Sequence, residues 1–274
     1  MPSFRRAQRF PLLDRANLAR IVGLSAGVVT AIQAGTAVVA IRKGRRDYAD
    51  AVWGPGLAAV AVTSAIAGTG DARRRWALAG ATTLWAARLE RQMLARLRRS
   101  DKEDSRYTEF LEGDSTIAVL GKVFFTQALS QLVVSAPIQM AAASALPRGV
   151  RRWLAPTGLA LMMGGALTEA AADHQKSVYS ARPKDQRPDV LDTGLWAWSR
   201  HPNYFGDSLV WDGAWLTAAA SSPAAWTFPA PAAMTYLLVF ATGAKRTEKR
   251  MQDRPAYRDY QQRVAFFFPR RPRH

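Results

Sequence analysis

Uncharged, apolar stretches alternate with arginine-rich connectors along most of the chain. Residues Ile21–Ile41 and Ala51–Gly70 contain no charged side chain, and each has about the 20 residues that a helix needs to cross a hydrocarbon core. Further apolar runs follow at Trp76–Ala87, Thr116–Pro147 and Trp153–Ala172. This pattern predicts membrane-spanning helices rather than a soluble globule.

The last apolar run, Phe205–Ala244, is too long for one helix, and the polar break Ser221–Pro223 predicts that it folds as a helical hairpin. Counting the runs predicts an all-α, polytopic membrane bundle of about seven transmembrane helices. We expect a single membrane domain over residues 1–274, with a basic lead-in at 1–20 and a basic tail at 245–274.

Two charged connectors, Arg88–Asp114 and Lys176–Asp192, are predicted to be loops outside the membrane. The run before the first of them, Trp76–Ala87, is short for a span. It reaches the membrane boundary only if Arg88 and Arg91 extend their side chains toward the head groups.

The formal net charge of +17 would suggest a nucleic-acid partner in a soluble protein. Arginines beside apolar runs have a simpler explanation, because cytoplasmic loops are rich in Lys and Arg and anionic lipids attract them. We therefore expect membrane lipids and no nucleic acid as partners. The ten Lys and Arg residues of the tail predict that the tail lies in the cytoplasm and the N-terminus outside.

Composition narrows the chemistry further. Cysteine is absent, which excludes disulfides and thiolate catalysis. No pair of His or carboxylate residues has metal-site spacing and no GxGxxG follows a strand pattern, so we expect neither a metal nor a Rossmann domain. The Ala-rich and Arg-rich composition is typical of a GC-rich bacterial genome, which predicts a bacterial cytoplasmic membrane.

The densest polar chemistry lies in the segment 194–215, which reads GLWAWSRHPNYFGDSLVWDGAW. Pro202 disfavours the helical conformation at His201, and Asn203 is expected to cap the helix that follows. The free backbone N–H groups of that helix, together with Arg200, would bind an anionic group. Five residues make up this candidate site: Arg200, His201, Asn203, Tyr204 and Asp207.

Several stretches in combination resemble the DUF1295 branch of the steroid 5-alpha-reductase family. They are RLERQ at 88–92, KEDSRY at 102–107, LTEAAADHQ at 167–175, GLWAWSRHPNYFGD at 194–207 and RPAYRDYQQRVAFFFPR at 254–270. Asp50, Trp53 and Gly54 also match an early D-x-x-W-G pattern, so that the resemblance covers residues 47–271.

This resemblance implies a seven-helix membrane reductase that binds NADPH from the cytoplasm. It would reduce a carbon–carbon double bond conjugated to a ketone in a lipid-soluble, steroid-like substrate. Such chemistry needs a positioned donor for the charge that develops on the carbonyl oxygen, in a site closed to water.

The resemblance also assigns roles to individual residues. Asn203 and Asp207 would hold the nicotinamide end, Asp173 would orient the cofactor, and Arg200 is a candidate for phosphate contact. His201 and Tyr204 complete the motif, and Arg246 and Tyr257 are candidates for the adenine–ribose end. The family's carbonyl donors, a glutamate and a tyrosine, have no clear match, and the possible stand-ins are Asp50, Glu90 and Tyr107.

Two other hypotheses stay open from the sequence. The RHPNY turn also occurs in membrane methyltransferases of isoprenylcysteine or phospholipid, which would bind S-adenosylmethionine through Glu248 and nearby tail residues. A non-catalytic membrane scaffold is the third. The sequence leaves the substrate, the choice between NADPH and NADH, and the oligomeric state open.

Overall fold

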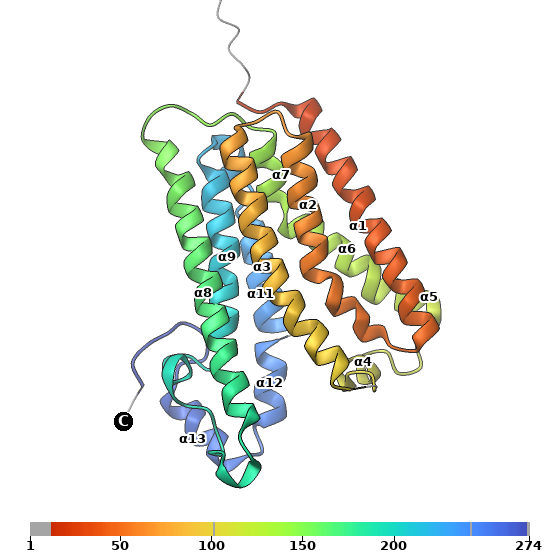
Figure 1. Ribbon diagram of the computed structural model, residues 1–274, viewed down its shortest axis with the longest axis vertical. Coiled ribbons are helices and arrows are strands. Elements are labelled where there is room, and N and C mark those ends of the chain that lie inside the picture. The colour runs from red at the N-terminus through yellow and green to blue at the C-terminus, as the bar shows by residue number, and fades with distance from the viewer. Residues whose placement is uncertain (1–11, 101, 242, 273–274) are drawn as a thin grey trace, which may run out of the picture.

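The computed structural model describes residues 12–100, 102–241 and 243–272, which form a bundle of helices without a β-strand among them (Figure 1). The long helices are α1 (Arg15–Lys43), α2 (Trp53–Ala67), α3 (Ala72–Arg98), α8 (Leu154–Ala181) and α9 (Pro202–Ala219). The shorter ones are η1 (Arg46–Val52), α4 (Ser105–Phe110), α5 (Thr116–Val119), η2 (Leu120–Phe125), α6 (Thr126–Val134), α7 (Ala136–Ala142), η3 (Val150–Trp153), η4 (Lys184–Gln186), η5 (Gly194–Ala197), α10 (Ser222–Ala225), α11 (Pro229–Tyr236), η6 (Leu237–Ala241), α12 (Ala244–Met251) and α13 (Pro255–Arg263). The all-helical prediction is confirmed for this part of the chain.

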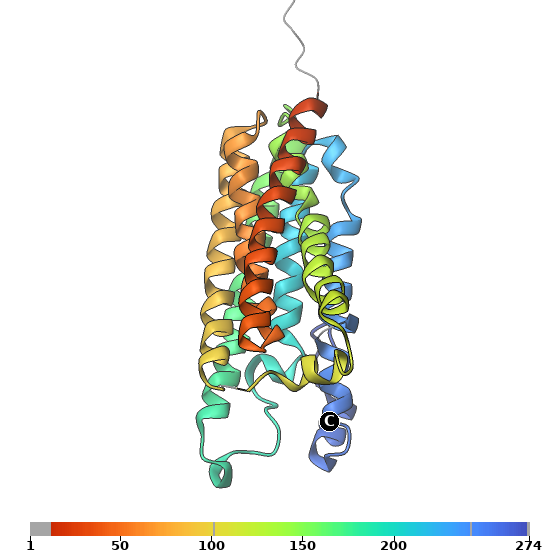
Figure 2. The ribbon, with the colours of Figure 1, turned by 90° about the vertical axis from the view of Figure 1, so that its right-hand side faces the viewer.

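Four helical stretches among the described residues are long and apolar enough to cross a membrane. They are Arg15–Lys43, Arg46–Ala67, Thr116–Val134 and Ser222–Met251. Helices α3, α8 and α9 run alongside them in both views (Figures 1 and 2). The chain therefore has the architecture of a membrane protein. The first eleven residues of the predicted basic lead-in lie outside the described residues.

Short polar side chains and glycine set the helix ends. The Asp14 carboxylate accepts a hydrogen bond from the backbone N–H of Asn17, and Asp71 accepts one from Arg74 at 2.8 Å, which satisfies free donors in the first turns of α1 and α3. Gly44 ends α1 with a left-handed φ of 63°, a conformation that glycine adopts without strain.

Helices α8 and α9 pack closely because each carries glycines at the contact. A β-carbon on Gly165 would lie 2.5 Å from the carbonyl oxygen of Gly206, and one on Gly213 would lie 2.5 Å from that of Gly158. Small residues allow this close approach between membrane helices, where lipid supplies no hydrophobic force to hold them together. The motif at the start of α9 is thereby held against the lower part of α8.

Two predicted helix ends were wrong. Helix α3 continues through Arg98, into the predicted loop Arg88–Asp114. It stays helical there because Arg88 and Arg96 form ion pairs with carboxylates of other elements. Helix α8 continues to Ala181, past the predicted start of a loop at Lys176. No proline interrupts it before Pro183, and the residue preceding that proline is extended.

Three further features concern a helix break, a helix cap and the break of the last apolar run. The helices formed by the apolar run Thr116–Pro147 break at Ser135, two residues before Pro137, and end at Ala142. The cap predicted for Asn203 was also wrong, because α9 begins one residue earlier at Pro202, with His201 at the N-cap position. The predicted hairpin break is confirmed, since α9 ends at Ala219 and α10 begins at Ser222.

We expect Gly165→Ala to destabilise the protein by about 1–3 kcal/mol, because its new methyl group would collide with backbone atoms of α9. Gly164→Ala is a matched control on the same helix, since a β-carbon there meets nothing within 4 Å. Thermal unfolding of both variants in detergent measures the difference. Equal midpoints in the two variants would contradict the close packing.

Candidate functional site

The segment that precedes α9 is fixed between α8 and the C-terminal tail. The indole Nε1 of Trp196 donates to the carbonyl oxygen of Ala172 at 3.0 Å, and the Tyr260 hydroxyl donates to the carbonyl oxygen of Trp196 at 2.6 Å. Gly194, with a φ of 60°, makes the turn in contact with the Gln175 side chain. The turn therefore has a defined position before α9 begins.

Glu248 in α12 accepts hydrogen bonds from four side chains. Arg200 reaches it through Nε and Nη2, each at 3.0 Å, and Nε2 of His201 lies 2.9 Å from Oε1. The Tyr257 hydroxyl donates to Oε1 at 2.8 Å, and Nε2 of Gln261 donates to Oε2 at 2.7 Å. One carboxylate thus ties α12, α13 and the RHPNY turn together.

The protonation of these partners favours the same arrangement. Burial lowers the pKa of His201 although Glu248 acts in the opposite direction, so the neutral ring with its proton on Nε2 donates to Glu248. Burial, followed by the hydrogen bond to Glu248, raises the pKa of Tyr257, so that its hydroxyl keeps its proton. Arg200 also donates through Nη1 to the carbonyl oxygens of Gln261 and Val264. Its role here is to hold the turn, and its phosphate contact stays a prediction.

A second polar network joins α3, α8 and α9. Asp173 accepts from Asn203 Nδ2 at 3.1 Å, from Arg88 Nη1 at 2.9 Å and from Gln92 Nε2 at 3.0 Å. Arg88 also pairs with Glu169, one helical turn before Asp173. Membrane helices bury charges only with such partners.

Two acceptors beside this network have no hydrogen-bond partner among the described residues. They are Oδ1 of Asn203 and Oδ1 of Asp207, which lies one turn further along α9 and is 5% exposed. Buried polar atoms normally have partners, and an exception calls for an explanation such as a ligand. The Asn203 oxygen would suit a ligand that carries an N–H donor, whereas the indole N–H groups that face Asp207 belong to Trp211 and Trp85.

Asp50 and Tyr107 meet in a third cluster. Asp50 in η1 accepts from the Tyr107 hydroxyl at 2.6 Å, from Arg106 Nη2 at 2.9 Å and from Arg96 Nη2 at 2.6 Å. Burial, followed by the charge of Asp50, raises the pKa of Tyr107 well above its usual value. The phenol therefore remains protonated at neutral pH.

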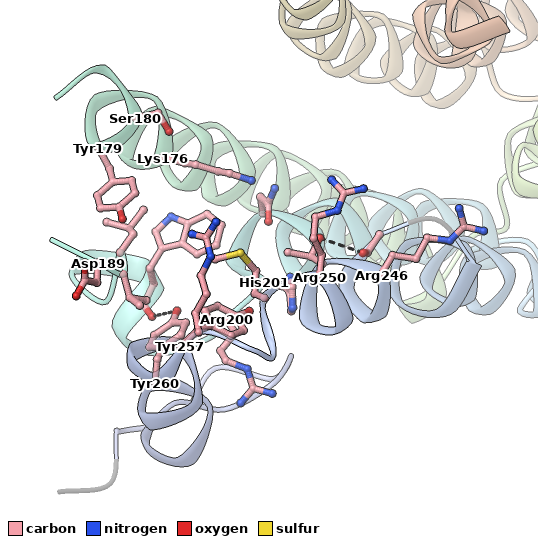
Figure 3. Close-up of a pocket in the computed structure, with 18 of the residues that line it drawn as sticks. Lys176, Tyr179, Ser180, Asp189, Arg200, His201, Arg246, Arg250, Tyr257 and Tyr260 are labelled. Atoms are coloured by element: carbon pink, nitrogen blue, oxygen red, sulfur yellow. Dashed lines mark hydrogen bonds between the residues drawn. The ribbon is translucent and has the colours of Figure 1, made fainter. Parts of the chain in front are cut away.

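A cavity of about 590 Å³ opens between lower α8, the loop after it and the tail (Figure 3). Lys176 and Tyr179 of α8 line one side, and Arg246 and Arg250 of α12 line another, with His201 between them. Two of its described lining residues are Asp and nine are Lys or Arg, namely Arg96, Arg106, Lys176, Lys184, Arg187, Arg200, Arg246, Arg250 and Arg254. This charge favours a polyanionic ligand.

Six of the eight cofactor residues predicted from sequence line this cavity: Arg200, His201, Asn203, Tyr204, Arg246 and Tyr257. Asp173 of α8 accepts a hydrogen bond from Asn203, and Asp207 lies one turn after Asn203 on α9. Asp50 and Tyr107 are brought together by α4. Glu90 lies on α3 away from the lining, and it has no ion pair within the described ranges.

Sequence reasoning missed part of the site. It gave Glu248 a role only under the methyltransferase hypothesis, although this carboxylate holds the RHPNY turn. It also left Lys176, Arg250 and Arg254 unassigned. The role of Arg250 could have been predicted from the sequence, because Arg246 and Arg250 are four residues apart and so share one face of a helix.

Comparison with known proteins identifies the family. Residues 37–264 match the family described as "Protein of unknown function (DUF1295)". The chain belongs to the DUF1295 family. DUF1295 is the steroid 5-alpha-reductase-like branch, so the resemblance seen in the sequence is confirmed.

One relative is an uncharacterized protein of Schizosaccharomyces pombe, 32% identical over 164 residues. The match covers 53% of this chain and 47% of the yeast protein, so the chain spans about half of its relative's length. Because the relative is a yeast protein, this comparison gives no support to the bacterial origin expected from composition. No solved structure matches the chain.

We expect Glu248→Gln to release the tail from the RHPNY turn, because it removes the charge shared by four donors. Hydrogen bonds to a charged group contribute roughly 1.5–3 kcal/mol, so cleavage by trypsin after Arg250 in α12 and after Arg258 in α13 should accelerate at least tenfold. Asp259→Asn is the control, since this exposed carboxylate on α13 has no ion pair in the described part of the chain. Equal cleavage rates would show that Glu248 does not hold the tail.

Proposed function

We propose that this protein is an integral-membrane, NADPH-dependent reductase of a carbon–carbon double bond conjugated to a ketone in a lipid-soluble substrate. The cation-lined cavity carries this proposal. Its volume of about 590 Å³ lies in the range of small-molecule sites, and its charge suits the phosphates of NADPH. The unpartnered oxygen of Asn203, which lines the cavity, suits an N–H donor of a nicotinamide carboxamide.

The proposed topology has seven spans. Helices α3, α8 and α9 would add three to the four stretches that are long and apolar enough. The cavity and the basic tail lie at the same end of the bundle (Figure 1). The positive-inside rule would place that end in the cytoplasm, where NADPH is available.

Bound NADPH would supply the hydride, and the protein would supply a proton and a positioned donor. Tyr107 is the proposed donor, because burial keeps its phenol protonated. Its single O–H, which donates to Asp50 at 2.6 Å, would turn to the carbonyl oxygen when the substrate binds. A donor directed at the carbonyl oxygen stabilises the charge that develops there. Glu90 is retained as the other candidate from the sequence.

The methyltransferase hypothesis fits the cavity less well. S-adenosylmethionine carries a sulfonium cation. Arg96, Arg106 and Arg200 are paired with carboxylates, and the other six lining Lys and Arg residues, which have no ion pair in the described part of the chain, would repel that cation. That hypothesis also needs Glu248 for the cofactor, whereas this carboxylate already accepts from Arg200, His201, Tyr257 and Gln261. Both observations support NADPH over S-adenosylmethionine.

Calorimetric titration of the detergent-purified protein should detect binding of NADPH and none of S-adenosylmethionine. Arg250→Gln should weaken NADPH binding about tenfold, because it removes one charged donor from the cavity wall. Arg258→Gln, on α13 outside the lining, should leave the affinity unchanged. Binding of S-adenosylmethionine without any response to NADPH would reject the reductase.

Tyr107→Phe should lower kcat for NADPH oxidation with a steroid-like enone by about 100-fold, the effect of losing one positioned proton donor. NADPH affinity should stay unchanged, because the hydroxyl contacts Asp50 rather than the cavity. Glu90→Gln is measured beside it. If only Glu90→Gln lowers kcat, the donor is Glu90 and the assignment of Tyr107 fails.

A further inference from the structure

The segment after α13 turns back toward the lower rim of the bundle before the chain ends (Figure 1). It runs beside the residues that precede α9. Three hydrogen bonds hold it there, from Arg200 N to Ala265 O at 2.9 Å, from Ser199 Oγ to Phe267 O at 2.7 Å and from Arg270 N to Trp198 O at 3.0 Å. Its position relative to the bundle is therefore fixed.

The segment after α13 lies at the point where the apolar surface of α8 ends. The hydrogen bond from Trp196 to Ala172 places the turn before α9, and with it the tail segment bonded to that turn, beside the last apolar residues of α8, because the exposed His174 and Lys176 follow. Charged residues begin where a membrane helix leaves the hydrocarbon. Residues at this level therefore lie among the lipid head groups.

The three phenylalanines of the segment face different surroundings. The Phe266 ring lies 5.3 Å from that of His201 and under the Arg200 guanidinium, and Phe267 is buried. Phe268 is 74% exposed, next to Trp198, which is 46% exposed. An exposed indole at head-group level matches the aromatic belt of membrane proteins, and an exposed phenyl ring there suits insertion at the acyl boundary.

Cations flank these rings. Arg270 and Arg271 are exposed, and neither has an ion pair or a ring contact among the described residues. Free guanidinium groups bind phosphate well, since each offers several N–H donors in one plane. Exposed rings and free guanidinium groups thus occur side by side at one level.

We propose that Trp198, Phe268, Arg270 and Arg271 form a binding site for anionic phospholipid, which we name the tail patch. The two rings insert among the head groups, and the two guanidinium groups bind lipid phosphate. Because Phe266 of the same segment packs on His201 and Arg200, bound lipid holds the tail against the RHPNY turn. This proposal is independent of which cofactor occupies the cavity.

The test uses the full chain in nanodiscs that hold one copy each, made from phosphatidylcholine with or without phosphatidylglycerol. Hydrogen exchange is measured at the amides of residues 266–268, which donate to no backbone acceptor among the described residues. Phosphatidylglycerol should slow exchange roughly tenfold, as expected for two arginines at an anionic surface. The double variant Arg270→Gln with Arg271→Gln should abolish that slowing, and Phe268→Ser should reduce it.

Arg258→Gln is the matched control, an exposed arginine on α13 outside the tail patch, and it should keep the full effect of phosphatidylglycerol. Equal exchange in the two lipids would overturn the proposal. Slowing that survives the double variant would do so as well. Slowing seen only in nanodiscs that hold two copies would assign the patch to a second chain instead of lipid.

Discussion

The carboxylate of Glu248 is the interaction on which the lower half of the molecule depends. It lies in a segment with ten Lys and Arg residues, so the tail would otherwise repel itself and the basic connectors near it. It accepts from Arg200 and from the uncharged His201, Tyr257 and Gln261, so it ties the tail to the RHPNY turn without using any cation of the tail itself. Cations of the tail are then free to line the cavity.

A second constraint comes from inside the bundle. Gly165 and Gly206 let α8 and α9 approach closely, and this brings Asp173 within reach of Asn203. Arg88 of α3 supplies the opposite charge. The same contact therefore explains why the helices pack and why polar groups can be buried beside the cavity, so fold and site have one physical origin.

Much of the fold could be predicted from the sequence, because apolar runs and proline have direct structural consequences. The hairpin break near Ser221 and the family followed from such local signals. The length of α3 did not, because Arg88 and Arg96 stay helical only through partners that are distant in sequence. The role of Glu248 in holding the RHPNY turn could not be predicted for the same reason, since its four partners become neighbours only after folding.

The extension of α8 beyond the bundle has a mechanical consequence. Its 28 residues span about 42 Å, so that in the proposed seven-span topology α8 is longer than the hydrocarbon core, which is about 30 Å thick. A continuous helix transmits tilt along its length, and tilt responds to bilayer thickness. Lys176 and Tyr179 lie on the protruding end, so a thinner or thicker membrane would shift one wall of the cavity relative to the other. The lipid composition of the host membrane would then help to determine the width of the cavity.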